Sequence, residues 1–414
     1  MRLLFLLPES PCPERCGPHV HNTSLLKLAC EWADCGVIGF WRGAEGLSRW
    51  ESFAKEFPQV AVHGVFPENA GITCTWHRFK ALFTGCPLGL GNFVNLGANS
   101  AIKRVIAAHR YDVSIIAFHQ LLNLREAASQ APIVLIPFDA HSMAYQRGYR
   151  SRVSPFDKVR LYLSYLAFRH MEKRCYRQFT LVAPVSDVDC RWLRDGCPSI
   201  PLRELPIAVE GRYFEQRRKS DAPGKPVHLV CGGVSTTTSI SNAIVDFVVD
   251  NYPQLKQEHP QLRTTIWGRG VVPGKLQRCL AKHPEIRSLT WADDYLQAVA
   301  ETDIYLYPQQ FGSGIQTKVQ HMMAAGVPVV ARWETLEPLG AQHGKSAFLF
   351  DSVASLHTAL SLLIARPELR QSVGWEGRER MLAKYSMPAV ACVFKSMLTG
   401  IVGQCQENSN SQGS

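Results

Sequence analysis

The chain alternates between short apolar runs and longer segments with helical spacing. Twelve β-prone runs of four to six residues, most of them apolar, recur from the N-terminus to residue 350, and helical or turn-rich segments separate them. Strands that alternate with helices predict parallel sheets covered by helices on both faces, so the expected fold class is α/β. The runs lie at residues 3–7, 37–40, 60–65, 113–118, 133–137, 181–185, 227–231, 264–267, 288–291, 304–307, 327–331 and 347–350.

The tenth run opens a unit of strand, glycine loop, helix and strand. Gly312 and Gly314 bracket Ser313 between that run and the helical pattern. Glycine at such a turn lets a ligand approach the backbone, and the free N–H groups of the following helix attract anions. Lys318, about one turn into the predicted helix, adds a point charge. The pattern predicts a phosphate cradle, with glycines that serve packing alone as the alternative. The cradle candidates are Gly312, Ser313, Gly314, Ile315 and Lys318.

Three motifs follow one another in this unit. They are D-I-x-L-x-P at 303–308, F-G-S-G-I-x-x-K-V at 311–319 and M-A-A-G-V-P-V-V-A at 323–331. Their order resembles the donor-binding segment of retaining glycosyltransferases with the GT-B fold (glycosyl transferases group 1, family 4-like). The resemblance implies two Rossmann-like domains whose parallel sheets face a central cleft, with a nucleotide-sugar bound against the C-terminal domain.

Length and resemblance together predict the domain organisation. A chain of 414 residues is too long for one ordinary core, so two domains of about 200 residues are expected. A turn at 205–210 resembles the interdomain turn of the family. It divides an N-terminal acceptor domain, 1–205, from a C-terminal donor domain, 206–385. Residues 386–403 resemble the last family helix, which crosses back to the first domain, and the polar residues 404–414 are expected to be disordered.

Two departures from the family pattern affect the donor site. Ser313 and His321 stand where the family usually carries two glutamates, so the glutamate contacts to the sugar and the ribose are lost. A neutral imidazole has one donor and one acceptor, so His321 either binds a ribose hydroxyl or packs on its helix. Gly233 closes the first strand of the second domain, without the Arg and Lys that often follow it in the family. Arg269, after the next strand, is the candidate for the missing positive charge, unless it only faces solvent.

Polar residues also follow strands in the first domain. Ligands of parallel sheets bind at the carboxyl ends of strands, and His119 follows the fourth run while Asp139 and His141 follow the fifth. The resemblance places a functional histidine after the fifth run, where Asp139 stands and His141 comes two residues later. These three are the candidate catalytic residues. Gly17, in the first loop, permits close approach of an acceptor or phosphate, with a plain turn as the alternative.

Composition narrows the class of protein. Apolar residues make up 46% and charged residues 19%, values typical of a globular protein in water, and no apolar run approaches the ~20 residues of a membrane span. Residues 3–7 are expected to form a buried strand rather than a signal peptide. Thirteen cysteines without regular spacing argue for reduced thiols in a cytoplasmic protein. The D-x-D at 187–189 is interpreted as structural, so no required metal and no other cofactor is expected.

The net charge of +10 indicates an anionic partner. No nucleic-acid module and no ladder of basic and aromatic residues is present, which argues against nucleic acid. The segment 147–177 concentrates nine Lys/Arg against two acids. It is either an ordinary solvated helix or a peripheral contact with an anionic membrane, on the inner face if the protein is cytoplasmic.

The expected function is therefore a retaining, hexosyltransferase-type glycosyltransferase. It would move a sugar from a nucleotide-sugar to a hydroxyl of a glycan, lipid-linked or small-molecule acceptor, in polysaccharide or glycoside biosynthesis. One alternative is a GT-B sugar-nucleotide epimerase, which needs more carboxylates than the cleft residues provide. The other is a degenerate, non-catalytic binding protein, suggested by the lost glutamates and the missing Arg/Lys pair.

Overall fold

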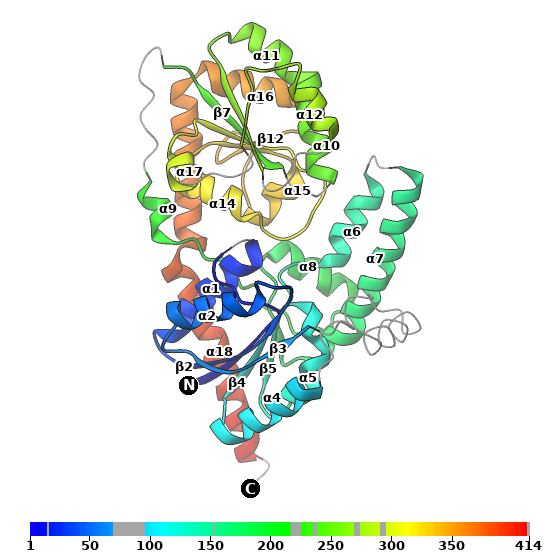
Figure 1. The fold of residues 1–414 in the computed structure, drawn as a ribbon, viewed down its shortest axis with the longest axis vertical. Helices are drawn as coiled ribbons and strands as arrows, with labels where there is room; N and C mark the ends of the chain where they lie inside the picture. The colour runs from blue at the N-terminus through cyan, green and yellow to red at the C-terminus, as the bar shows by residue number, and fades with distance from the viewer. Residues whose placement is uncertain are drawn as a thin grey trace. The chain divides into compact units, whose positions relative to one another are not determined.

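The protein consists of two compact α/β units. Unit 1 comprises Met1–Ala208 and Met387–Ser414, and unit 2 comprises Val209–Ser386. Each unit contains one six-stranded sheet with helices packed against it (Figure 1). The expected α/β class with two parallel sheets is confirmed. The computed structural model describes residues 1–14, 16–68, 96–151, 154–216, 225–234, 238–268, 274–289 and 295–411.

The sheet of unit 1 has the order β3-β2-β1-β4-β5-β6, and every neighbouring pair is parallel. Its central strand β1 is apolar from Leu3 to Leu7 because alternate side chains enter two different cores. Leu3 and Phe5 pack on one face, and Leu4 and Leu6 pack on the other. The strands are β1 (Arg2–Leu7), β2 (Asp34–Trp41), β3 (Ala61–Pro67), β4 (Val113–Ala117), β5 (Ile133–Ile136) and β6 (Leu181–Val182).

Helices cover both faces of this sheet. The Leu3–Phe5 face packs against α1 (Gly17–Cys30), α2 (Gly46–Glu56) and α18 (Met387–Ser411). The other face packs against α4 (Leu96–His109), α5 (Arg125–Ala128), α6 (His141–Arg150), α7 (Pro155–Cys175) and α8 (Asp187–Gly196). Helices α6 and α7 form a hairpin (Figure 1). Short turns η2 (His119–Leu124) and η3 (Tyr176–Gln178) complete the unit.

Helix α18 differs from the sequence-based expectation in two respects. It continues to Ser411, so residues 404–411 are helical rather than disordered, and no Gly or Pro interrupts them. By length and composition, Met387–Gln404 is also the one helix in the described part of the chain that could cross a membrane, although no such run was expected. That signal is weak, because regularly spaced side chains of this window pack in the core of unit 1. They are Val390, Phe394, Met397, Leu398 and Ile401.

The sheet of unit 2 has the order β12-β11-β10-β7-β8-β9 and is also parallel throughout. Its strands are β7 (His228–Val234), β8 (Arg263–Gly268), β9 (Arg287–Leu289), β10 (Ile304–Tyr307), β11 (Val329–Ala331) and β12 (Phe348–Leu349). Its helices are α9 (Gly211–Glu215), α10 (Thr238–Asp246), η4 (Phe247–Asn251), α11 (Tyr252–Glu258), α12 (Gly274–Leu280), α13 (Tyr295–Ala300), α14 (Thr317–Ala324), α15 (Trp333–Leu336), η5 (Glu337–Leu339), α16 (Val353–Ala365) and α17 (Pro367–Tyr385).

All twelve predicted runs are strands, with ends displaced by at most three residues. The largest shortening is in β6, which ends at Val182 although the apolar run continues to Val185. Pro184 has no N–H group to donate to the ladder, so regular pairing stops there. The flanking N–H groups of Ala183 and Val185 still donate to backbone carbonyls at Leu135 and Phe138.

The two ends of unit 2 lie side by side. The N–H group of Val209 donates to the carbonyl of Tyr385 at 2.7 Å, and Val209 forms an isolated parallel bridge with Ser386. Unit 2 is therefore inserted into the chain of unit 1 through two adjacent backbone segments.

Candidate functional site

The predicted glycine loop connects β10 to α14. Gly314 has φ of +64°, a left-handed conformation that residues with a Cβ adopt only with strain. Gln316 is the N-cap residue of α14, but its side chain accepts a hydrogen bond from the Tyr307 hydroxyl (2.9 Å) instead of capping the helix. The first turn of α14 therefore carries no side-chain cap, the condition under which a helix N-terminus can receive an anion.

The remaining cradle candidates surround this turn. Ser313 and Ile315 are buried, so neither side chain extends into solvent. A Cβ on Gly312 would lie 2.5 Å from Nε2 of Gln309, whose amide donates to the carbonyl of Phe311. Lys318 is the second residue of α14 and is half-buried. Sequence analysis placed it about one turn into the helix, because the helix was predicted to begin before Thr317.

His321 lies in an aromatic cluster that sequence analysis did not predict. Its ring stacks on Tyr213 from α9, with 3.8 Å between centroids and 10° between planes, and meets Tyr295 edge-on at 5.9 Å. Burial, assisted by the positive charges of Arg212 and Lys318, lowers the pKa of His321 to about 3, so the ring is neutral. Within the described residues its Nδ1 atom has no hydrogen-bond partner. A neutral ring with one buried nitrogen that lacks a partner is able to form a further hydrogen bond, for example with a hydroxyl.

Two donor-site predictions have less structural support. Gly233 lies in β7, where the register with β8 shifts between Gly232 and Val234. The neighbouring Gly232 has a packing role, because a Cβ there would lie 1.9 Å from the Tyr305 hydroxyl. Arg269 lies outside the described residues.

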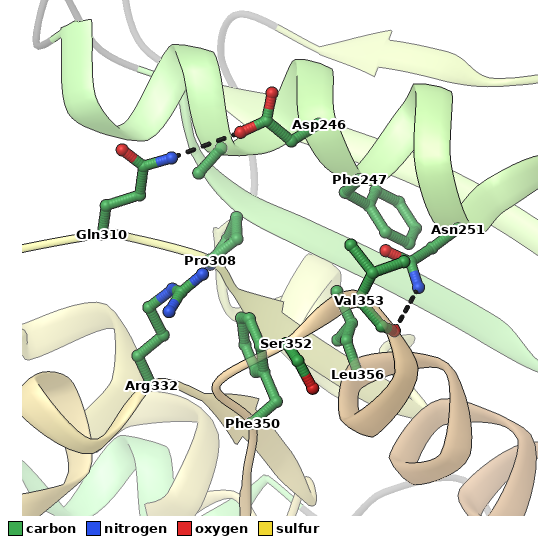
Figure 2. A pocket seen from close by; sticks show the side chains of 11 residues that line it. Asp246, Phe247, Asn251, Pro308, Gln310, Arg332, Phe350, Ser352, Val353 and Leu356 are labelled. Carbon is green, nitrogen blue, oxygen red and sulfur yellow. Dashed lines mark hydrogen bonds between the residues drawn. The ribbon is translucent and has the colours of Figure 1, made fainter. Parts of the chain in front are cut away.

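A small pocket opens at the carboxyl ends of β10, β11 and β12 (Figure 2). Arg332 follows β11 and lies over the ring of Phe350 at 5.0 Å, and its Nε atom is buried without a partner in the described structure. Across the pocket, Gln310 of the glycine loop donates to the carboxylate of Asp246 at 3.2 Å. Sequence analysis missed Arg332, although its place directly after a buried strand was the available signal.

In unit 1, two strained residues end adjacent strands. Phe118 after β4 has φ of +93°, and Phe138 after β5 has φ of +68°. Such values are rare for bulky residues and are found where surrounding structure enforces them, often at functional sites. They place His119 and His141 together, with 4.1 Å between ring centroids in an edge-on arrangement. Two of the three predicted catalytic side chains are thus in contact.

The histidines at this edge are held neutral. Burial lowers the pKa of His119 well below its ordinary value, and the charge of His141 lowers it further. Burial also lowers the pKa of His141, while Asp139 acts in the opposite direction. Sequence analysis missed His21, which is fully buried, meets Phe138 edge-on at 5.4 Å and has a pKa lowered by burial to about 3. Nδ1 of His119, Nε2 of His141 and both ring nitrogens of His21 have no partner in the described residues.

Two buried carboxylates hold the turn that carries Asp139 and His141. Asp189 accepts a hydrogen bond from the N–H group of Ala140 at 2.8 Å. Glu172 of α7 accepts from the N–H group of Ser142 at 3.0 Å, and from its hydroxyl. The side chain of Asp189 is thus committed to backbone support, in agreement with the structural interpretation of the D-x-D.

Gly17 is the first residue of α1 and lies beside a compact polar cluster. Among the described residues, Glu9, Cys16 and His19 form the one group that could hold a metal ion, with ligand atoms within 4.8 Å of one another. Burial lowers the pKa of His19, but Cys16 and Glu9 outweigh it and raise that pKa to about 9. Nε2 of His19 lies 2.8 Å from Glu9, and Arg49 binds the same carboxylate at 3.2 Å. Two cationic groups of the chain therefore already bind Glu9.

Comparisons with known proteins connect these features. Residues 227–366 match the family described as Glycosyl transferases group 1. Among curated protein sequences none matches the chain significantly. Of the solved structures, HepE from Anabaena, in complex with UDP and glucose, aligns with a TM-score of 0.67 at 13% identity, over 97% of this chain and 100% of its own.

The chain has the GT-B fold. Sucrose-phosphate synthase from Thermosynechococcus elongatus gives a TM-score of 0.67 at 13% identity, over 98% of this chain and 100% of its own. A mutant of TarM from S. aureus, in complex with Fondaparinux, alpha-GlcNAc-glycerol and UDP, gives 0.65 at 8% identity, over 96% and 99%. Two Rossmann-like units within a GT-B architecture were expected, and this expectation is confirmed. The family match and the GT-B fold together support a GT-B glycosyltransferase.

Proposed function

We propose that this GT-B protein is a retaining, hexosyltransferase-type glycosyltransferase that uses a nucleotide-sugar donor and a glycan, lipid-linked or small-molecule acceptor. One observation carries the proposal. The family match at 227–366 includes the whole β10–loop–α14 segment, in which Gly314 is left-handed and the helix N-terminus is uncapped. UDP is the first nucleotide to test, since it is named in the HepE and TarM complexes.

In the proposed donor site, the backbone does most of the binding. Charge develops on the leaving diphosphate, and N–H groups at the start of α14 with the ammonium of Lys318 would stabilise it without rearrangement. Arg269 would add a second cation, and Gly233 would allow close approach at β7. Ser313 offers its backbone in place of a glutamate, and the open nitrogen of His321 would bind a ribose hydroxyl.

In the proposed acceptor site, side chains do most of the work. His119 and His141 are neutral, so either imidazole can accept a hydrogen bond or a proton from an acceptor hydroxyl. Asp139 favours the charged form of His141 and would stabilise the imidazolium. Gly17 would allow an acceptor or phosphate to approach the start of α1. Cytoplasmic location, a role in polysaccharide biosynthesis and independence of metal ions are further parts of the proposal.

A second candidate is a non-catalytic GT-B protein that binds a nucleotide or glycan. The observation that favours it is the position of His321, which is stacked and buried where a family glutamate usually stands. Turnover of any nucleotide-sugar in the presence of an acceptor would eliminate this candidate.

The test begins with thermal shift using UDP, GDP, ADP, CMP and dTDP and their sugars, each with and without magnesium. We expect one nucleotide class to raise the melting temperature, with no dependence on the metal. Transfer from the stabilising donor to acceptor mixtures is then followed by NMR, and an α-linked donor should give an α-linked product. An inverted product would overturn retention, and the absence of both stabilisation and turnover would overturn the proposal.

A further inference from the structure

Helix α7 exposes a line of large apolar side chains. Eleven large hydrophobic residues are exposed in the described structure, and five of them lie within Phe156–Leu166. Four are spaced by three or four residues, so they share one face of the helix over about 15 Å. We call this line the α7 stripe: Phe156 (79% exposed), Val159 (61%), Leu163 (60%) and Leu166 (44%), with Tyr162 (44%) beside it.

The stripe does not face the core of the hairpin, because another face of α7 packs against α6. Phe168 stacks on Tyr145 of α6 at 5.0 Å, and Tyr165 packs on Tyr149 at 5.7 Å. Below them, Glu172 binds Ser142 at the start of α6. These contacts fix the rotation of α7, so the stripe stays directed away from the packed face.

The same helix is basic beyond and beside the stripe. Its last two turns carry exposed Lys173 and Arg174, and Lys158 and Arg160 flank the apolar side chains. The only acids in the helix are Asp157, which pairs with Arg160 at 3.2 Å, and the buried Glu172. An apolar face with basic flanks matches a surface that is apolar below and negatively charged above.

We propose that α7 docks this protein on an anionic lipid bilayer, with the stripe inserted at the level of the acyl chains and the basic residues at the phosphate groups. A second copy of the chain fits the α7 stripe less well than a bilayer does. In a two-fold contact the stripe would meet itself, and the basic flanks would face each other with like charge. The proposal does not depend on the transfer reaction, so each can fail without the other.

Docking through α7 would also bring the His119–His141 pair close to the bilayer surface. Phe168 of α7 contacts both rings, at 5.4 Å to His119 and 5.3 Å to His141. One helix therefore carries the stripe on one face and supports the histidine pair on another.

The test is flotation of the full chain with two kinds of vesicles, phosphatidylcholine alone and an equal mixture with phosphatidylglycerol. We expect the wild type to float with the mixed vesicles and to bind the neutral ones at least about tenfold more weakly. Phe156→Ser with Leu163→Ser should reduce binding to mixed vesicles by about tenfold or more, because both side chains insert. The matched control is Leu47→Ser with Trp375→Ser, which removes two exposed apolar side chains elsewhere and should bind as the wild type does.

Two charge-reversal variants distinguish docking through α7 from the general attraction of a basic protein to an anionic surface. Lys173→Glu with Arg174→Glu should weaken binding to mixed vesicles severalfold more than Lys55→Glu with Lys282→Glu, which gives the same net charge at exposed positions elsewhere. Circular dichroism would check that each variant is folded. Failure of the wild type to bind mixed vesicles would overturn the proposal, as would equal binding by stripe and control variants. A wild-type dimer that the stripe variant makes monomeric, without vesicle binding, would assign the stripe to self-association.

Discussion

The two sheets have the same strand order, yet their carboxyl edges are built in opposite ways. Numbered within its own unit, each sheet reads 3-2-1-4-5-6. In unit 2 the left-handed turn at that edge is Gly314, and the groups beside this turn are backbone N–H groups with one lysine. In unit 1 the residues with positive φ that follow β4 and β5 are Phe118 and Phe138, and the groups beside them are buried imidazoles.

Under the proposed function, this difference lets one topology serve two chemical tasks. A glycine turn adopts positive φ without steric cost and exposes the backbone, which suits an extended anion that needs many donors. Phenylalanine at positive φ is strained, but Phe118 and Phe138 pack against histidine rings whose burial keeps them neutral. A backbone site is tolerant of side-chain changes nearby, whereas a side-chain site depends on each residue.

The largest expected effect is on kcat, from a histidine at the carboxyl edge of the sheet in unit 1. His141→Ala should lower kcat by about 10²–10⁴, because it removes a proton acceptor, while nucleotide affinity at unit 2 stays unchanged. Initial-rate kinetics with the identified donor, together with calorimetry of nucleotide binding, would measure both. His343→Ala, in unit 2, is the matched control. If His141→Ala retains full activity, the division of labour between the two edges is wrong.

The second largest expected effect is on the pH dependence of stability, through the buried carboxyl group of Glu172 in unit 1. Burial raises the pKa of Glu172 from 4.5 to about 7, although hydrogen bonds from Ser142 and the charge of Arg169 oppose the shift. Between these values the folded protein holds a proton that the unfolded chain has lost, so Glu172 makes the protein less stable as the pH rises from about 4.5 to 7. Glu172→Gln should abolish this pH-dependent loss of stability, which is of the order of 3 kcal/mol in the free energy of unfolding between the two pKa values.

Urea unfolding at a series of pH values would measure this change. The buried histidines, whose lowered pKa values act in the other direction below about pH 6.5, are common to both proteins and cancel in the difference. Glu31→Gln, at an exposed position, should leave the pH profile as it is. A Glu172→Gln profile parallel to the wild type would show that this carboxylate is ionised in the folded state.

The role of the glycine turn can be tested by comparing two valine substitutions at glycines that both have positive φ. Gly314→Val and Gly344→Val both place a β-branched residue at positive φ, +64° and +72°, and each should cost about 1–3 kcal/mol of stability. Only Gly314→Val should also abolish nucleotide binding, since Gly344 lies in another loop where a Cβ meets nothing within 4 Å. Equal nucleotide affinity in the two variants would move the anion site away from the glycine loop.

The smallest expected effect is at Lys318. Lys318→Ala should weaken nucleotide binding by about 1–3 kcal/mol, the range for losing one charge-assisted hydrogen bond. Lys345→Ala, an exposed lysine of the same unit, is the control and should bind like the wild type. Unchanged affinity in Lys318→Ala would remove this residue from the cradle and leave the backbone N–H groups of the α14 turn in place.

The parts that could be predicted from sequence are those that depend on local pattern. Most strands are buried on both faces and are continuous apolar runs, so they could be located, whereas β3 and β9 are more exposed and were located by their β-prone residues. A glycine loop between a strand and a helix also has a clear local signature. The partners of His321 could not be predicted, because Tyr213 and Tyr295 reach it from distant parts of the chain. The same holds for Glu172, whose contact with Ser142 exists only once the α6–α7 hairpin has formed.

Backbone strain was also invisible in the sequence. Nothing in the run that ends at Phe118, or in the run that precedes Phe138, indicates a residue with positive φ, since phenylalanine is disfavoured there and tertiary packing enforces it. Arg332 had a signal, its place at a strand end, but its open Nε atom depends on how Phe350 covers one side of the guanidinium.

The pairing of Val209 with Tyr385 and Ser386 has a consequence for how this protein can be rebuilt. A segment whose entry and exit are adjacent behaves as a cassette, because removing it leaves two chain ends that a short linker can rejoin. Unit 1 from one protein of this fold can therefore be recombined with unit 2 from another at these two positions. Under the proposed function, such an exchange would alter the donor preference through unit 2 and the acceptor preference through unit 1.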